Sequence, residues 1–121
     1  VVEHAEMTGR QLHDKVKRVT RVMAELGADL IKCFYTEDFG DIVANLPVPA
    51  FTIGAEKLAT DLDVLKKAAD SVAAGARGII FGRNIFMAER PQALIAALNS
   101  VMNEGVSPQA AFDRLGAADE G

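Results

Sequence analysis

Apolar residues recur along the first part of the chain at steps of four and three, which predicts an amphipathic helix. The residues on that stripe are Leu12, Val16, Val19, Met23 and Leu26. Gly27 follows at the position where a left-handed glycine commonly ends a helix. Residues 28–35 then form a mostly apolar run without strict alternation, which is typical of a strand buried on both faces of a parallel sheet. Lys32 lies in the middle of this run.

The same order of helix and strand continues through the centre of the chain. A short helix is predicted over 36–46, and the Pro47-Val48-Pro49 segment ends it. Residues 50–53 predict a second strand. Thr60 can cap the following helix, which acidic residues in its first turn stabilise and Gly75 ends.

A third strand is predicted over 78–81, and Gly82-Arg83-Asn84 follows it as a tight turn. Pro91 suits the first turn of the next helix, and Ser107-Pro108 begins a final one. Residues 116–121 are small and acidic, and we expect them to form a frayed tail.

Strands that alternate with helices predict an α/β fold with a parallel sheet and right-handed crossovers. Three strands do not close a barrel, and a complete (β/α)₈ TIM barrel takes about 250 residues. The chain of 121 residues is therefore expected to supply roughly half of such a barrel. We expect its N-terminal half to be missing from this sequence or to come from another chain.

Composition narrows the class of protein. Half of the residues are hydrophobic and 25% are charged, as in ordinary globular domains. The net charge is −4, and basic residues are interleaved with acidic ones, which argues against nucleic acid or anionic membrane as partners. No apolar run approaches the roughly 20 residues of a membrane span. Cys33 is the single cysteine, and a reducing cytoplasm fits best.

Lys32 is the first candidate for chemistry, because burying a lysine among apolar neighbours is costly. An apolar setting disfavours the ammonium form and leaves free amine, which condenses with a ketone or aldehyde as a Schiff base. The iminium then draws electrons during carbon–carbon cleavage. The ordinary alternative is a lysine whose stem is buried while its amine reaches solvent at the strand end.

Two glycine turns follow consecutive strands, at the positions where barrel enzymes commonly bind phosphate. They are Gly54-Ala55-Glu56-Lys57 and Gly82-Arg83-Asn84. Glycine lets an anion approach the backbone, and Lys57 and Arg83 can add positive charge. Each turn alone is a weak signal, because such turns often contain glycine for steric reasons.

These residues resemble a known family of barrel aldolases. It includes deoxyribose-phosphate aldolase, archaeal-type class I fructose-bisphosphate aldolase and the enzyme that processes a phosphorylated autoinducer. The resemblance covers about residues 25–115. It rests on three segments: Gly27-Ala28-Asp29-Leu30-Ile31-Lys32, then Pro47-Val48-Pro49 leading to Gly54-Ala55-Glu56-Lys57-Leu58, and most specifically Gly78-Ile79-Ile80-Phe81-Gly82-Arg83-Asn84-Ile85-Phe86.

The resemblance implies the C-terminal portion of a TIM barrel, with strands six to eight in residues 1–115 and a flexible tail over 116–121. It implies that Lys32 is the Schiff-base lysine. It also implies that the substrate phosphate binds at Gly54, Ala55, Gly82 and Arg83. No metal or cofactor is implied, the substrate is a phosphorylated small molecule, and the assembly is a homo-oligomer.

The sequence departs from the family at two places. Ala55 stands where the family usually has a second glycine, although an alanine N–H binds phosphate where its φ is negative. The fructose-bisphosphate branch resembles this chain but carries a tyrosine acid/base after strand five, and residues 2–9 contain no tyrosine. Glu3, His4 or Glu6 can replace it in proton transfer, and His4 is the preferred candidate.

Further expectations concern the cysteine and the other polar residues near these motifs. His13 is expected on the polar, solvent-facing side of the first helix. Cys33 should face the outer helices, opposite to Lys32, as a small buried hydrophobe. Tyr35 and Thr36 lie at a strand end where barrel active sites form, so either can contact substrate. The nearby carboxylates of Glu37, Asp38 and Asp41 are interpreted as a solvated loop and helix start.

The sequence therefore predicts a class I, metal-independent aldolase or lyase that acts on a small phosphorylated sugar or keto compound. One alternative keeps the lysine but transfers an acyl group to coenzyme A, as the autoinducer-processing relative does. The other is a half-barrel fragment or phosphate-binding module without catalysis, because a fold does not fix a function.

Overall fold

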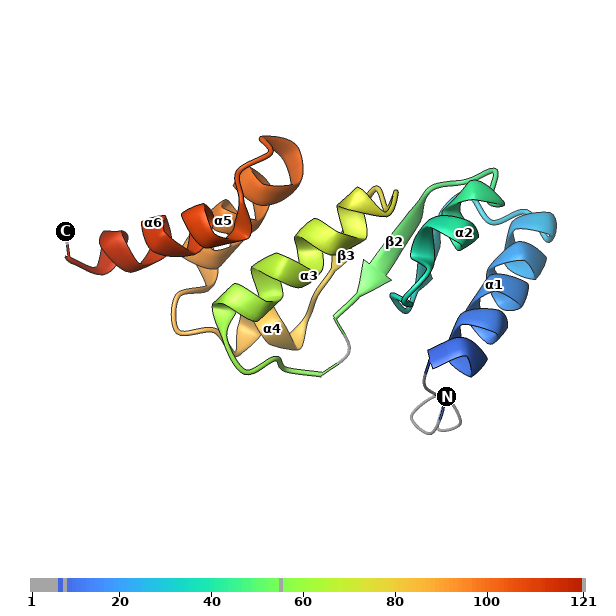
Figure 1. Cartoon of the computed structure of the whole chain (residues 1–121), viewed down its shortest axis with the longest axis horizontal. Coiled ribbons are helices and arrows are strands. Elements are labelled where there is room, and N and C mark those ends of the chain that lie inside the picture. The colour runs from blue at the N-terminus through green and yellow to red at the C-terminus, as the bar shows by residue number, and fades with distance from the viewer. Residues whose placement is uncertain (1–6, 8, 55, 121) are drawn as a thin grey trace.

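The computed structural model describes residues 7, 9–54 and 56–120, in which helices and strands alternate as the sequence predicts (Figure 1). The elements in chain order are α1 (Gly9–Glu25), β1 (Ile31–Cys33), α2 (Phe39–Ala44), β2 (Ala50–Ile53), α3 (Asp61–Ala73), β3 (Gly78–Ile80), α4 (Arg83–Phe86), α5 (Pro91–Asn103) and α6 (Pro108–Glu120). The molecule is elongated, with α1 at one end and α5 and α6 at the other.

The strands form one parallel sheet in the order β1-β2-β3, which confirms the predicted parallel pairing. Lys32 pairs with Phe51, and Phe51 pairs with Gly78. The Gly54 N–H donates to the Ile80 carbonyl at 3.3 Å, so the pairing continues one residue beyond β2. All three strands consequently end at the same edge of the sheet.

The two faces of the sheet differ sharply in burial. One face carries Ile31, Cys33, Ala50 and Thr52, all at most 8% exposed. On this face the hydroxyl of Thr52 donates to Ser71 of α3 at 3.0 Å. The opposite face carries the alternate residues of the strands, and Lys32 on it is exposed. Side-chain alternation along a strand therefore separates a packed face from an open one.

Two apolar clusters hold the helices in place. The larger joins α3, α5 and α6 through fully buried side chains such as Val64, Leu65 and Leu94. The smaller joins α1, β1 and α2 around Ile31, Phe39 and Ile42. Fully burying a side chain of this size contributes about 1.5–3 kcal/mol before entropy is counted. The helices are thus fixed by packing against the sheet and against each other.

The predicted helix ends are confirmed at three places. Gly27 and Gly75 have φ values of 103° and 109°, in the left-handed region that favours glycine. Gly75 also lies so close to α2 that an added Cβ would be 2.9 Å from a methyl carbon of Val43. At the start of α3, the Thr60 hydroxyl accepts from the Asp63 N–H at 3.1 Å.

Some predicted boundaries are wrong. The first strand was expected over 28–35 but contains only Ile31–Cys33, because it pairs with β2 on one side and that pairing sets its length. The helix expected over 36–46 is reduced to Phe39–Ala44. The tail expected from residue 116 is not irregular at that point, since α6 continues to Glu120.

The buried side of α1 also differs from the predicted stripe. Val19 and Leu26 are 41% and 82% exposed, whereas His13 and Thr20 are nearly fully buried. The helix packs against β1 and α2, and this contact selects a face rotated from the most apolar one. Among the described residues, no helix is long and apolar enough to cross a membrane.

Candidate active site

Lys32 lies on the open face of the sheet, near the C-terminal end of β1. The expectation of a buried amine is wrong for this chain, because its side chain is exposed. The physical reason is that three strands form an open sheet, so nothing in the described residues encloses that face. Lys32 nevertheless lines a groove of about 200 Å³ whose apolar walls include Val16, Phe34 and Ile53.

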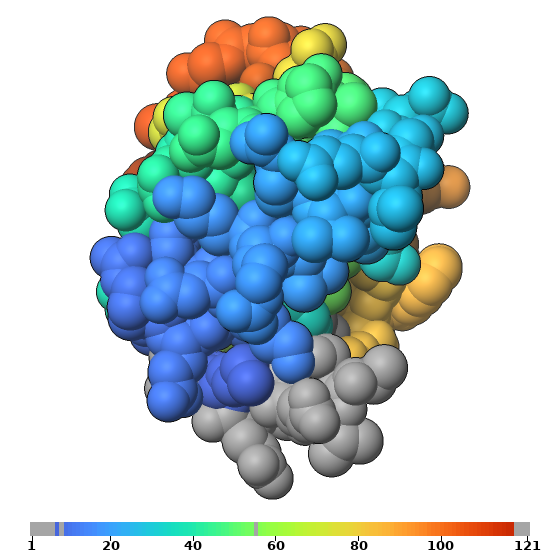
Figure 2. Space-filling view, turned by 90° about the vertical axis from the view of Figure 1, so that its right-hand side faces the viewer, coloured from blue at the N-terminus to red at the C-terminus, as the bar shows by residue number. Residues whose placement is uncertain are grey.

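Helix α1 forms the other wall of this groove. Its contributions include Leu12, Val19 and Met23. Leu12 and Met23 also pack against the core cluster around Val16, whereas Val19 is exposed. Figure 2 views the molecule from the end at which α1 lies, and the blue side chains of α1 make up much of that face. The groove therefore combines one lysine with an otherwise largely apolar surface.

The strand register fixes how far Lys32 is from the two glycine turns. With strands about 4.8 Å apart and about 3.3 Å of rise per residue, the Cα atoms of Lys32 and Gly54 are roughly 11 Å apart. The same arithmetic gives roughly 16 Å to Gly82, one strand further along. A lysine side chain and a short sugar phosphate together span the shorter distance.

Gly54, the first residue of the first turn, is buried and closely surrounded. A Cβ at this position would lie 3.0 Å from the amide nitrogen of Asn84 and 3.0 Å from the ring of Phe81. The close approach of these two side chains explains the glycine. Ala55, the next predicted phosphate-binding residue, lies outside the described residues.

Gly82 and Arg83 of the second turn are both exposed. In contrast to Gly54, a Cβ on Gly82 would meet nothing within 4 Å, and its φ of −89° is open to any residue. The protein's own packing therefore does not require glycine at this position. Arg83 begins α4 at the same edge of the sheet.

Asn84 joins the two turns, a role that the sequence analysis did not assign. Its side chain is fully buried. The side-chain carbonyl accepts from the Leu58 N–H at 2.7 Å, and the side-chain amide donates to the Glu56 carbonyl at 3.1 Å. The sequence could not show this, because the partners lie 26 and 28 residues away.

One lysine belongs to the first turn and a second lies beside it. The ammonium of Lys57, which the sequence analysis proposed as a source of charge, donates to the carbonyl of its neighbour Leu58 at 3.2 Å. The ammonium of Lys67, from α3, lies 3.5 Å from the Gly54 carbonyl. Burial lowers the pKa of Lys67 from its usual value. Lys67 is thus a second, partly buried amine at this edge.

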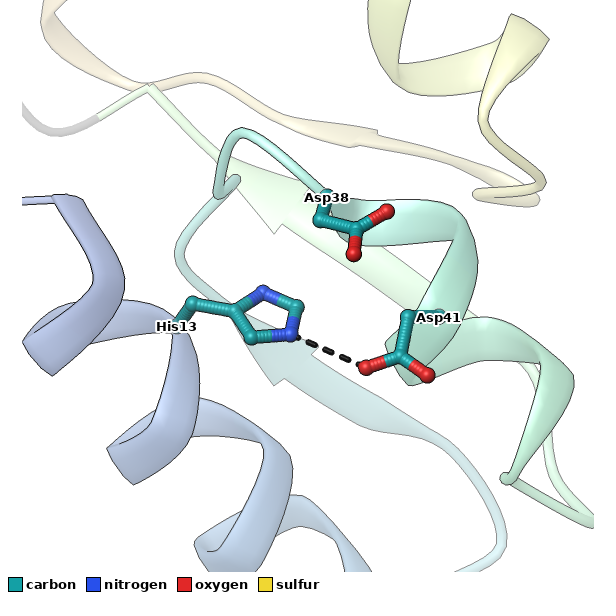
Figure 3. Close-up of side chains that lie close together, drawn as sticks. All are labelled: His13, Asp38 and Asp41. Carbon is teal, nitrogen blue, oxygen red and sulfur yellow. Dashed lines mark hydrogen bonds and ion pairs between the residues drawn. The ribbon is translucent and has the colours of Figure 1, made fainter.

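His13 connects α1 to the loop after β1, which corrects its predicted place on the solvent-facing side. The ring is 2% exposed. Its Nε2 lies 3.0 Å from the Asp41 carboxylate (Figure 3). Its Nδ1 lies 2.9 Å from the Thr36 hydroxyl. Because an ionised carboxylate only accepts, Nε2 donates to Asp41. In the neutral ring, Nδ1 then accepts from Thr36.

Asp41 also accepts a hydrogen bond from a lysine. The Lys17 ammonium donates to the same carboxylate oxygen at 2.8 Å. These hydrogen bonds, first that from Lys17 and then that from His13, lower the pKa of Asp41 from its usual value. The network ties the first helix to α2 across the segment that follows Lys32.

In the described part of the chain, one group of side chains has the spacing of metal ligands: His13, Asp38 and Asp41. Figure 3 shows the ring of His13 directed at Asp41, with Asp38 at the start of the same short helix. The Lys17 ammonium already neutralises Asp41. We therefore interpret the cluster as a structural ion-pair network.

The other candidate residues on β1 and the loop after it have contacts within the fold. Thr36 is 4% exposed and is bonded to His13, so its hydroxyl serves the fold. The ring of Tyr35 packs against Phe39, and its pKa is raised by burial and by the negative charge of Asp70. Cys33 is buried as predicted. His4, the predicted acid/base, lies outside the described residues.

The sequence of the chain is similar to those of known proteins. The chain is 36% identical over 94 residues to 3-hydroxy-5-phosphonooxypentane-2,4-dione thiolase of Yersinia enterocolitica, which covers 77% of this chain and 32% of the thiolase. It is 37% identical to an uncharacterized aldolase of Saccharolobus solfataricus, over 75% of this chain and 35% of that protein. The chain thus spans about a third of the length of these curated relatives.

Solved structures give the same result. A Schiff base forming fructose-1,6-bisphosphate aldolase matches with a TM-score of 0.72 and 31% identity, over 79% of this chain and 40% of that one. An archaeal fructose 1,6-bisphosphate aldolase matches with a TM-score of 0.70 and 33% identity, over 74% and 37% of the two chains. The model of the DeoC/LacD family of aldolases matches residues 2–88. The chain therefore belongs to the DeoC/LacD aldolase family.

Proposed function

We propose that the protein containing this chain is a class I, metal-independent aldolase that acts on a small phosphorylated sugar or keto compound. In this proposal the chain supplies strands six to eight of a TIM barrel. The open face of the sheet would be the barrel interior, and the edge at which all three strands end would be the catalytic face.

The observation that carries the proposal is the position of Lys32. It is the charged residue of a strand whose neighbours Ile31 and Cys33 are buried on the other face, and it lines an apolar groove. The two glycine turns lie at the same edge of the sheet. A relative with 31% identity is described as a Schiff base forming aldolase, which supports the same chemistry here.

The proposed reaction begins when the free amine of Lys32 attacks the substrate carbonyl. Loss of water from the carbinolamine gives an iminium ion. Removal of a proton from the β-hydroxyl group then breaks the adjacent carbon–carbon bond, and the electron pair of that bond moves to the iminium to form an enamine. Protonation of the enamine carbon and hydrolysis release the second product and restore the amine.

Proton transfer requires an acid/base group close to the imine. His4 remains our candidate, with Glu3 and Glu6 as alternatives on the same segment. Thr36 is engaged with His13, and the ring of Tyr35 packs on Phe39. The hydrogen bond to His13 argues against Thr36 as the proton donor.

We propose that the substrate phosphate binds at Gly54, Ala55, Gly82 and Arg83. Gly82 supports this role, because its glycine is not required by neighbouring protein atoms and its surface is open. Arg83 can add charge beside it. Lys67 adds a partly buried amine below the first turn.

The test is a cleavage assay on the full-length protein with fructose 1,6-bisphosphate and smaller phosphorylated ketoses. Lys32→Met should lower kcat by about a thousandfold or more, because removal of a covalent nucleophile eliminates the main route. Lys66→Met, at an exposed position on α3, is the matched control and should retain activity. Full activity of Lys32→Met would refute the proposal.

A second candidate reaction is acyl transfer to coenzyme A by the same lysine. The identity of 36% to a thiolase favours it. Incubating the full-length protein with a phosphorylated diketone, with and without coenzyme A, separates the two reactions. Formation of an acyl-coenzyme A product would support transfer, whereas release of two carbonyl products without it would support cleavage.

A further inference from the structure

Asn84 is the only fully buried asparagine among the described residues, and both ends of its side chain are paired with backbone groups of the other turn. The Leu58 N–H can only donate and the Glu56 carbonyl can only accept. This chemistry fixes which end of the amide faces which partner. An aspartate of the same shape cannot make both bonds as a carboxylate.

The amide also fits tightly beneath the end of β2. A Cβ at position 54 would lie 3.0 Å from the side-chain nitrogen of Asn84. A larger residue at position 54 would therefore crowd the Asn84 amide. Asn84 follows directly after Gly82 and Arg83 in the chain. Asn84 belongs to the second turn and is bonded to backbone groups at the first, so this one buried side chain fixes the position of the two turns relative to each other.

A phosphate held by two turns needs N–H groups that converge on the same oxygens. Because a displacement of about 1 Å can cost roughly a hundredfold in rate, the spacing of the turns matters as much as their composition. We propose that Asn84 is a positioning residue that sets this spacing and thereby determines the preference for phosphorylated over unphosphorylated substrates. This inference rests on the proposed function.

The test compares Asn84→Asp with the native full-length protein on a phosphorylated ketose and on its unphosphorylated analogue. The variant keeps the shape and the acceptor for Leu58 but replaces the donor to Glu56 with an oxygen, which repels that carbonyl. We expect kcat/KM for the phosphorylated ketose to fall about ten- to a hundredfold, and that for the analogue to change less than about threefold.

Asn103→Asp on α5 makes the same chemical change at an exposed position, where the side-chain amide of Asn103 donates to the Asn99 side chain at 2.6 Å. This control should keep the native ratio of the two kcat/KM values. An equal loss with both substrates in a folded Asn84→Asp protein, or no loss with either, would overturn the inference. An equal loss of kcat/KM with both substrates is the result expected if Asn84 has only a general structural role.

A second measurement uses the native protein and does not depend on whether the variant folds. Inorganic phosphate should slow hydrogen exchange at the Leu58 amide, because binding to both turns stabilises the bond to Asn84. The Asp63 amide, which donates to the exposed Thr60 cap, is the internal control and should not change. Phosphate binding, established by equilibrium dialysis, without slower exchange at Leu58 would contradict the inference.

The outcomes separate this inference from the proposed function. If Lys32→Met is fully active, the aldolase mechanism fails whatever Asn84 does. If phosphate does not bind at all, both the phosphate site and the role of Asn84 are rejected. Suppose that phosphate binds and Lys32 is essential, but Asn84→Asp keeps the native ratio of kcat/KM for the phosphorylated ketose to kcat/KM for its analogue. In that case only the proposed role of Asn84 is wrong.

Discussion

At the scale of single residues, Lys32 and Cys33 show how strand alternation separates neighbours into opposite surroundings. Lys32 is exposed on the open face, whereas Cys33 is 8% exposed on the packed face. Burial disfavours the thiolate and raises the pKa of Cys33 to about 11. The strand therefore exposes the side chain of Lys32 and buries the thiol of Cys33.

Cys33 should be unreactive in the folded protein. At pH 8, a pKa of about 11 leaves roughly one thousandth of the thiol ionised, and the thiolate is the reactive form. Alkylation with N-ethylmaleimide, followed by mass spectrometry, should label Cys33 slowly in the native state and rapidly after unfolding in urea. Rapid complete labelling of the native protein would contradict the packed position of this side chain.

The burial of a side chain could be predicted where it follows from the local sequence pattern. It could not be predicted where it depends on contacts with residues far away in the chain. The alternation of Lys32 and Cys33 is a property of any strand, so it could be predicted. The burial of His13 depends on Thr36 and Asp41, which are 23 and 28 residues away. Nothing near His13 in the sequence indicates those contacts.

At the scale of elements, the ends of helices were more predictable than their buried faces. Gly27, Gly75 and Thr60 act at their own positions, through backbone φ and a local hydrogen bond. The buried face of α1 depends on where β1 and α2 lie. In consequence His13 and Thr20 are buried, and apolar Leu26 is not.

The contact between α1 and α2 should weaken in acid through Asp41. Its pKa is lowered in the fold by Lys17 and then by His13, with Asp38 also nearby. A lowered folded pKa means that the ionised carboxylate stabilises the fold above its unfolded pKa of about 3.9. That stabilisation is lost as pH falls through the folded pKa.

The measurement compares the free energy of unfolding of Asp41→Asn and native protein in urea across the acidic range. The asparagine is neutral throughout, so the deficit of the variant should be largest near neutral pH and should shrink below about pH 4. Asp14→Asn, at an exposed position on α1, is the matched control. A deficit independent of pH would argue against the ion-pair network.

At the scale of the whole molecule, the parallel sheet and its order could be predicted because strands alternate with helices throughout. Exposure of Lys32 could not be predicted from its apolar neighbours, since burial depends on how many strands surround it. The described sheet has three strands, and the chain spans about a third of its curated relatives. The face of the described sheet that carries Lys32 is therefore open.

The central claim is that Lys32 forms an imine with a phosphorylated carbonyl substrate. The most direct measurement is reduction with borohydride of the full-length protein mixed with such a ketone, followed by peptide mapping. The account predicts a single substrate-derived adduct on the peptide that contains Lys32, and no adduct on the Lys67 peptide. An adduct on another lysine, with Lys32 unmodified, would contradict it.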